Sequence, residues 1–122
     1  MTILELEKKT VKFAVESLKI VNLLIDENQD NLAEWLFYSS TQIGVSVSRA
    51  KAALEPNDFI LEMKESFSKA SETIYWLDII YENNFIKTMR YEILKYKCNN
   101  IRIEISKALK NAERFKSISS GF

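Results

Sequence analysis

Apolar residues recur every three or four positions through four successive segments of this chain, and this spacing constrains the fold more than any other feature of the sequence. A repeat near 3.5 residues places apolar side chains on one face of an α-helix. Sustained alternation of apolar and polar residues, which is typical of strands, does not dominate the sequence. The pattern therefore predicts an all-α protein.

The four segments predict helices over about residues 5–26, 32–53, 56–82 and 85–115, followed by a frayed tail over residues 116–122. The connectors between them are short, and short connectors favour antiparallel packing of neighbouring helices. We therefore expect one domain, residues 1–122, folded as an antiparallel up-down-up-down four-helix bundle.

Each segment has its own apolar stripe, which an amphipathic helix turns toward the core. The first stripe comprises Val11, Ala14, Val15, Leu18, Val21 and Ile25. The second comprises Leu32, Leu36, Ser39, Ile43, Val47 and Ala50. The third, a strict heptad seam, comprises Ile60, Met63, Phe67, Ala70, Ile74, Leu77 and Tyr81. The fourth comprises Leu94, Cys98, Ile101, Ile105, Ala108, Ala112 and Phe115.

Local signals mark the ends of these segments. Asp30 or Asn31 is expected to cap the second helix, and Pro56 suits the first turn of the third. Asn83 and Asn84 indicate a turn, because asparagine tolerates the left-handed conformation that ends many helices. Gly44 costs roughly 1 kcal/mol against alanine inside a helix. Either a close helix contact requires it or the helix simply tolerates it.

The residue types that are rare in this chain exclude several classes of activity. There is no histidine, which removes histidine-based acid–base catalysis and most zinc sites. Two glycines far apart cannot form a phosphate-binding loop, and a single cysteine cannot form an intrachain disulfide. Cys98 lies on an apolar stripe and is expected to be a small buried hydrophobe. We expect no enzyme, no catalytic residue, no cofactor and no metal site.

The sequence also bears on location. No run approaches the ~20 apolar residues of a membrane span, and the N-terminus lacks the pattern of a secretory signal. With one unpaired cysteine, the expected compartment is the cytoplasm, without a membrane partner.

Basic and acidic residues are equal in number over the whole chain but are unevenly distributed along it. Residues 84–122 contain 9 basic and 3 acidic residues, whereas residues 1–83 contain 8 basic and 14 acidic residues. One interpretation is that the basic last helix lies against acidic faces, within the chain or between subunits. The other is that its basic residues bind phosphates or an acidic partner. The candidates for such binding are Arg90, Lys97, Arg102, Lys107, Lys110 and Arg114.

Several large apolar residues lie off the main stripes, and contiguous exposed apolar surface usually marks an interface. We expect them to contribute to an interface between copies of the chain. These candidate interface residues are Trp35, Tyr38, Val45, Phe59, Tyr75 and Ile79.

Three segments resemble the bacterial "four helix bundle protein" family. They are residues 40–47 (STQIGVSV), 58–60 (DFI) and 69–77 (KASETIYWL), and the last is the most specific. The stretch from residue 12 to residue 23 is similar to the first helix of that family, so the resemblance covers about residues 10–115. The family includes proteins encoded by intervening sequences in large-subunit ribosomal RNA genes and accessory variability proteins of diversity-generating retroelements.

The resemblance implies a homopentamer shaped as a short barrel with a central pore, and it carries over no catalytic residue. The first functional hypothesis is a non-enzymatic homo-oligomeric scaffold or adaptor of the intervening-sequence type. Its partner would be RNA, a ribonucleoprotein or another protein. The alternative is a retroelement accessory protein that binds a reverse transcriptase and nucleic acid through the basic last helix.

Overall fold

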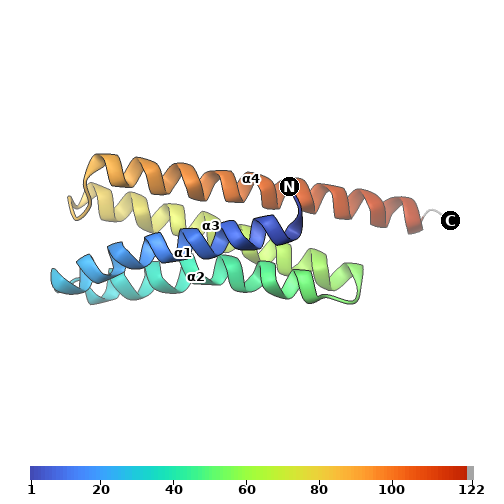
Figure 1. Ribbon diagram of the computed structural model, residues 1–122, viewed down its shortest axis with the longest axis horizontal. Coiled ribbons are helices and arrows are strands. Elements are labelled where there is room, and N and C mark those ends of the chain that lie inside the picture. The colour runs from blue at the N-terminus through green and yellow to red at the C-terminus, as the bar shows by residue number, and fades with distance from the viewer. Residues whose placement is uncertain (121–122) are drawn as a thin grey trace.

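The computed structural model describes the backbone of residues 1–120 and the side chains of residues 1–118. Its four helices are α1 (Ile3–Asp26), α2 (Asp30–Ala52), α3 (Pro56–Glu82) and α4 (Thr88–Ser120). No strand occurs within this part of the chain. The helices lie side by side with alternating direction (Figure 1), which confirms the prediction of an all-α four-helix bundle.

Short polar signals set several helix ends. The Thr2 hydroxyl accepts a hydrogen bond of 3.1 Å from the Glu5 backbone N–H and so caps α1. Pro56 occupies the first turn of α3, where its missing N–H is not needed. α2 differs from the prediction: Gln29 is its N-cap and makes no side-chain capping bond, so neither Asp30 nor Asn31 caps this helix.

α1 and α3 both end on an asparagine in the left-handed region, with φ of 61° at Asn28 and 62° at Asn84. In each case the next residue donates its N–H to a carbonyl five residues back. These bonds run from Gln29 to Leu24 (2.7 Å) and from Phe85 to Ile80 (3.1 Å). Each asparagine therefore takes the place that glycine usually fills at a helix C-terminus.

The last helix departs from the prediction at both ends. It begins at Thr88 rather than near Phe85, because the turn around Asn84 extends over residues 83–87. It then continues to Ser120, so the serine-rich segment expected to fray is helical up to that residue. Gly121 and Phe122, the end of the predicted tail, lie outside the described residues.

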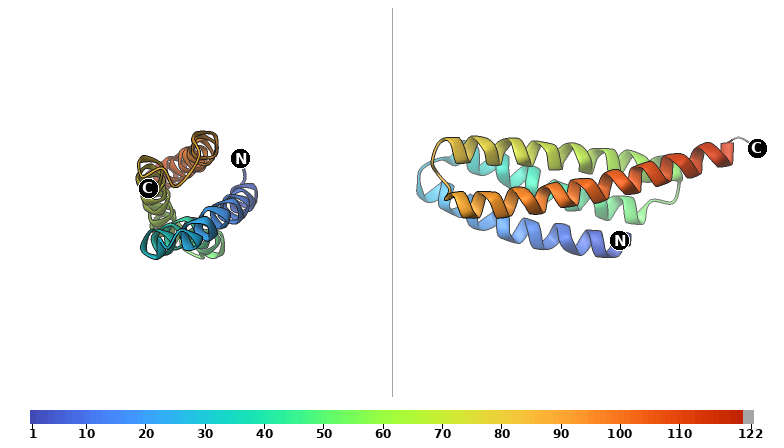
Figure 2. Two further views of the ribbon diagram at one scale, coloured as in Figure 1. Left: turned by 90° about the vertical axis from the view of Figure 1, so that its left-hand side faces the viewer. Right: turned by 90° about the horizontal axis from the view of Figure 1, so that it is seen from above.

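Each helix packs against the next one along the chain, whereas α1 and α4 meet over a much shorter stretch. Seen end-on in Figure 2, α1 and α4 stand further apart than the other neighbouring helices. α4 has 33 residues, or about 50 Å at 1.5 Å per residue, and its C-terminal turns extend past the bundle. The molecule is thus a bundle with three closely packed sides and one open side.

One hydrophobic core receives side chains from all four helices. The predicted stripes of α2, α3 and α4 supply most of it. Its largest fully buried side chains include Leu36, Ile43, Val47, Met63, Leu77, Leu94 and Ile105. Cys98 is fully buried, as predicted. Two aromatic members of the stripes are exposed instead: Phe67 lies at the edge of the bundle beneath Arg102, and Phe115 lies on the overhanging turns of α4.

The orientation of α1 contradicts the prediction. Its buried side chains are Leu6, Thr10, Phe13, Ser17, Ile20, Val21 and Leu24. Of the predicted stripe only Val21 is buried, while Val11, Val15 and Ile25 are exposed. The helix carries two apolar faces, and the face with the larger residues, Phe13, Ile20 and Leu24, fills the core.

Small residues let α1 approach α2 closely. A Cβ added to Gly44 would lie 2.7 Å from the Thr10 hydroxyl oxygen and 3.1 Å from the Thr10 Cβ. Distances this short leave no room for a side chain at position 44. The glycine is therefore required by packing, which decides between the two explanations that the sequence left open.

Candidate interaction surfaces

The outward face of α1 and α2 is a broad apolar surface, which we call the α1–α2 face. Val11 and Val15 keep 57% and 54% of their surface exposed, and Ile25 lies on the same side of α1. Phe37 and Val45 are exposed on the adjoining side of α2. Contiguous exposed apolar side chains of this kind mark interfaces rather than solvent-facing surface.

Two shallow hollows follow one another along the α1–α2 face. One, of about 430 Å³, is lined by Leu4, Val11, Val15 and Val45 among others. The other, of about 550 Å³, is lined by Ile25 and Phe37 among others. Sequence reasoning found Val45 but missed Leu4 and Phe37. It also placed Val11 and Val15 in the core, because the stripe to which they belong has helical spacing. The same spacing is equally compatible with a second, outward apolar face of α1.

Aromatic side chains gather on a second surface, the α2–α3 aromatic patch, defined by Trp35, Tyr38, Tyr75 and Trp76. Trp35 and Trp76 stack with ring centroids 4.8 Å apart, and Tyr75 lies 5.2 Å from Trp76. Lys69 lies 5.1 Å from the centre of the Tyr38 ring. Trp35, Tyr38 and Tyr75 are exposed, as expected of interface residues.

The remaining predicted interface residues lie elsewhere or are less accessible. Phe59 is half-buried at the start of α3, and Ile79 is half-buried near the end of that helix. Val45 belongs to the α1–α2 face rather than to the aromatic patch. The six candidates therefore do not form one surface: Trp35, Tyr38 and Tyr75 belong to the aromatic patch, Val45 to the α1–α2 face, and Phe59 to a hollow beside the start of α1.

The predicted basic residues of α4 do not form one surface. Arg102 turns toward α3, where it lies 5.9 Å from the centre of the Phe67 ring and donates a hydrogen bond to Asn99. Lys97 turns toward α1 and forms an ion pair of 2.8 Å with Glu16, while Lys107 pairs with Glu104 at 3.3 Å. The Lys97–Glu16 pair and a Lys95–Asp78 pair of 3.0 Å agree with the interpretation that the basic helix lies against acidic residues of the same chain, whereas the partners of Lys107 and Arg102 at Glu104 and Asn99 lie on α4 itself.

The other three basic residues are less constrained. Arg90 lines a hollow at the start of α4, whereas Lys110 and Arg114 are exposed near its overhanging end. Arg90 is thus about 30 Å from Lys110 along the helix, at 1.5 Å per residue. This separation prevents the three from acting as one compact phosphate site.

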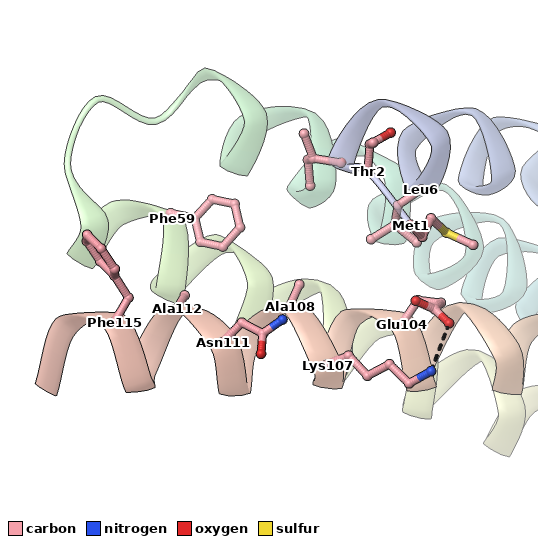
Figure 3. Close-up of a pocket in the computed structure, with 11 residues that line it drawn as sticks. Met1, Thr2, Leu6, Phe59, Glu104, Lys107, Ala108, Asn111, Ala112 and Phe115 are labelled. Carbon is pink, nitrogen blue, oxygen red and sulfur yellow. Dashed lines mark hydrogen bonds and ion pairs between the residues drawn. The ribbon is translucent and has the colours of Figure 1, made fainter. Parts of the chain in front are cut away.

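The side between α1 and α4 is hollowed where the two helices stand apart. Its hollow near the start of α1, about 490 Å³ in volume, is drawn in Figure 3. Phe59 and Phe115 lie toward one end of it and the Lys107–Glu104 pair lies at the other. Sequence reasoning did not foresee this hollow, because it depends on the spacing of two helices that are distant in the chain.

A thiol and a phenol with raised pKa values are held in their neutral forms. Burial raises the pKa of the Cys98 thiol to about 12, and this thiol donates a hydrogen bond of 3.4 Å to the Ala70 carbonyl. A hydrogen bond of 2.6 Å to Asp78 raises the pKa of Tyr91. A neutral buried thiol and a neutral phenol are poor nucleophiles.

In residues 1–120, no three histidine, cysteine or acidic side chains come together as metal ligands would. Within the same part of the chain, no helix combines the length and the apolarity needed to cross a membrane.

No family model and no curated protein matches this chain. A solved structure from Bacteroides thetaiotaomicron, described as a protein of unknown function from the S23 ribosomal protein family, has a similar fold. The two superpose with a TM-score of 0.87 and 23% sequence identity, over 90% of this chain and 99% of the other. At this identity the comparison establishes the shared fold, a four-helix bundle of nearly the same extent.

Proposed function

We propose that this protein is a non-enzymatic scaffold or adaptor that assembles from several copies of itself. The observation that carries the proposal is the α1–α2 face. Val11, Val15 and Ile25 are about half exposed although they continue a helical apolar repeat. Covering such a face with another copy removes apolar surface from water, at about 25 cal/mol per Å².

The arrangement of surfaces favours a closed ring over a simple dimer. A ring uses two different patches on each subunit, one for each neighbour. The α1–α2 face and the α2–α3 aromatic patch are two such patches, and they lie on adjoining sides of the bundle. The family resemblance implies that five copies close the ring.

The chemistry of the side chains agrees with a non-enzymatic role. The chain has no histidine, and its only thiol is buried with a raised pKa. The structural neighbour comes from a family named after a ribosomal protein, which supports the intervening-sequence branch of the resemblance. It lends no support to the retroelement branch.

Light scattering coupled to size-exclusion chromatography tests the proposal. A pentamer has a mass of about 71 kDa, five times the 14.2 kDa of one chain. The variant Val11→Glu/Val15→Glu should shift the mass toward a single chain, because each contact in the ring would then have to bury two glutamates. A mass near 14 kDa for the unchanged protein would overturn the proposal.

A matched control separates assembly from a general effect of added charge. Leu61 on α3 and Met89 on α4 are both exposed and lie outside the two proposed faces. The variant Leu61→Glu/Met89→Glu therefore adds the same charge and should keep the assembled mass. Dissociation of this control to the same extent would contradict the assignment of the α1–α2 face.

Binding of nucleic acid by α4 stays a prediction, carried by the excess of basic residues in 84–122. It predicts affinity for RNA or DNA that falls steeply with salt. Replacing Lys97, Arg102, Lys107 and Arg114 with glutamate should abolish that binding. Because Lys97 and Arg102 also contact Glu16 and Asn99, circular dichroism must show that the variant remains folded.

A further inference from the structure

Three hollows follow one another along the open side of the bundle, which we call the α1–α4 side. The first, of about 490 Å³, lies between the first residues of the chain and residues 104–115 of α4. The second, of about 210 Å³, lies between residues 9–16 and 97–101. The third, of about 800 Å³, lies between residues 20–23 and 81–90. Together they run along most of the length that α1 and α4 share.

The middle hollow is basic. Lys9 and Lys12 reach it from α1 and Lys97 reaches it from α4, against one acidic residue, Glu16. Glu16 pairs with Lys97. In the described part of the chain Lys9 and Lys12 make no ion pair. Phe13 is buried at the floor between the helices, most of the exposed surface that lines this hollow is apolar, and the lysine amines supply its charge.

The two outer hollows combine polar side chains, including Lys87 and Arg90 in the third and the Lys107–Glu104 pair in the first, with exposed apolar ones. In the third, Leu23 is 51% exposed beside the half-buried ring of Phe85. In the first, Phe115 is 66% exposed near the half-buried Phe59, as Figure 3 shows. Leu23 and Phe115 lie on different helices and at opposite ends of the α1–α4 side. Each outer hollow therefore offers an apolar contact, and the basic hollow lies between them.

Overall charge strengthens this pattern. The segments that contain α1 and α4, residues 1–27 and 84–122, carry 13 basic and 8 acidic residues. The segment between them, residues 28–83, carries 4 basic and 9 acidic residues. The excess comes from residues 84–122, because residues 1–27 carry 4 basic and 5 acidic residues. The basic α4 thus gives the open side a positive charge that attracts an acidic partner before contact.

We infer that the α1–α4 side binds an acidic amphipathic helix of a partner protein. Such a helix would lie along the open side, with carboxylates at Lys9 and Lys12 and apolar residues at Leu23 and Phe115. The outer hollows are separated by about 20 residues of α4, or ~30 Å, which a helix of about 20 residues spans. A nucleic-acid backbone would satisfy the lysines but would gain little from the apolar ends. The inference goes beyond the proposed assembly and does not depend on it.

The probe is a synthetic, fluorescein-labelled peptide helix of about 20 residues, long enough to span both outer hollows. It has leucines in its first and last turns and glutamates through its middle turns. Fluorescence anisotropy should show saturable binding to the full chain. Binding should weaken from about 0.01 M to about 0.15 M ionic strength, as the Debye length shortens from ~30 Å to ~8 Å. A second peptide with glutamine in place of glutamate should bind much more weakly.

Two protein variants locate the site. Lys9→Glu/Lys12→Glu should weaken peptide binding by about tenfold or more, because it replaces attraction with repulsion at the middle hollow. Arg49→Glu/Lys64→Glu makes the same change in charge on exposed residues of α2 and α3. At about 0.15 M ionic strength, where the Debye length is ~8 Å, it should leave binding within about twofold, although it also breaks the exposed ion pair of Lys64 with Glu113 of α4. Leu23→Ser removes an exposed apolar contact at one end and should weaken binding while thermal unfolding stays unchanged.

Several results would overturn the inference. One is the absence of saturable peptide binding at low salt, and another is an equal loss of affinity in Lys9→Glu/Lys12→Glu and in its control. A third is that a short single-stranded RNA binds more tightly than the peptide and that Lys9→Glu/Lys12→Glu weakens the binding of this RNA. The last result would assign the site to nucleic acid. Binding by Val11→Glu/Val15→Glu but not by the unchanged protein would instead assign the α1–α4 side to contacts between copies. A monomeric protein that still binds the peptide would refute the proposed assembly and leave this inference standing.

Discussion

A methyl group on the α-carbon of Gly44 would lie 2.7 Å from the hydroxyl oxygen of Thr10, so α1 and α2 touch at this point without room for a side chain. Thr10 is itself fixed, because its hydroxyl donates a hydrogen bond of 2.6 Å to the Glu7 carbonyl. The contact is therefore rigid on both helices.

Gly44→Ala should lower the free energy of unfolding by about 1–3 kcal/mol, the usual cost of overpacking a buried contact. Helix propensity alone predicts the opposite sign, a gain of roughly 1 kcal/mol. Urea unfolding of the two proteins decides between them. The double variant Thr10→Ala/Gly44→Ala should recover part of the loss, and strictly additive losses would show that the two residues do not clash.

Ionisation of Cys98 should make stability depend on pH in the alkaline range. Burial penalises the thiolate and raises the pKa of Cys98 in the folded protein to about 12, from an ordinary value of 9.0. The unfolded chain therefore loses this proton first. The contribution of the neutral Cys98 thiol to the free energy of unfolding is therefore complete below pH 9. It is lost as the pH rises toward 12, at up to ~1.4 kcal/mol per pH unit.

The measurement is urea unfolding across that pH range for the unchanged protein and for Cys98→Ala. The difference in slope between the two should equal the contribution of one thiol. A thiol-specific reagent should also react slowly with the native protein and rapidly in urea. Fast reaction of the folded protein would contradict the buried position of Cys98.

A buried hydroxyl links α3 to α2. Ser66 is fully buried and donates a hydrogen bond of 2.8 Å to the Ile43 carbonyl. Ser66→Ala should cost about 1 kcal/mol of unfolding free energy, the typical net value of such a bond. Ser68→Ala, an exposed change on the same helix, should be close to neutral. Equal effects in a thermal or urea denaturation would show that the bond contributes nothing specific.

The left-handed turn at Asn84 should discriminate between two small replacements. Glycine adopts φ of 62° without strain, so Asn84→Gly should keep or raise the unfolding free energy. Asn84→Ala should lower it by about 1 kcal/mol, because alanine is strained in that region. Thermal unfolding of the pair gives the comparison. Indistinguishable midpoints would mean that the turn relaxes when its residue is changed.

Most of the fold follows from the sequence because three of the four helices have one dominant apolar face. Leu36, Leu77 and Ile105 lie on predicted stripes, and all are fully buried. α1 is the exception because it has two apolar faces with the same helical period. Periodicity gives the spacing of a stripe but not its direction, and only packing against the other helices decides which face turns inward.

The candidate surfaces were less predictable than the fold. Trp35, Tyr38 and Tyr75 could be expected at the surface because they lie off the main stripes, and all three are exposed. The positions of Lys9 and Lys12 opposite Lys97 depend on how far α4 stands from α1. The distance between α1 and α4 is set by the packing of all four helices, so the sequence of either helix alone does not predict it. The basic residues of α4 were found as a set, but their directions follow from partners on α1 and α3.

The two apolar faces of α1 affect how a newly synthesised chain packs and whether it aggregates. Because either face of α1 could pack against α2, a specific steric contact is needed to favour one orientation. The close approach of Thr10 to Gly44 provides this contact. In a lone subunit the outward apolar face of α1 is exposed to water, and exposed apolar surface of this kind promotes aggregation. If copies assemble through this face, as proposed, assembly and solubility are coupled through this one helix.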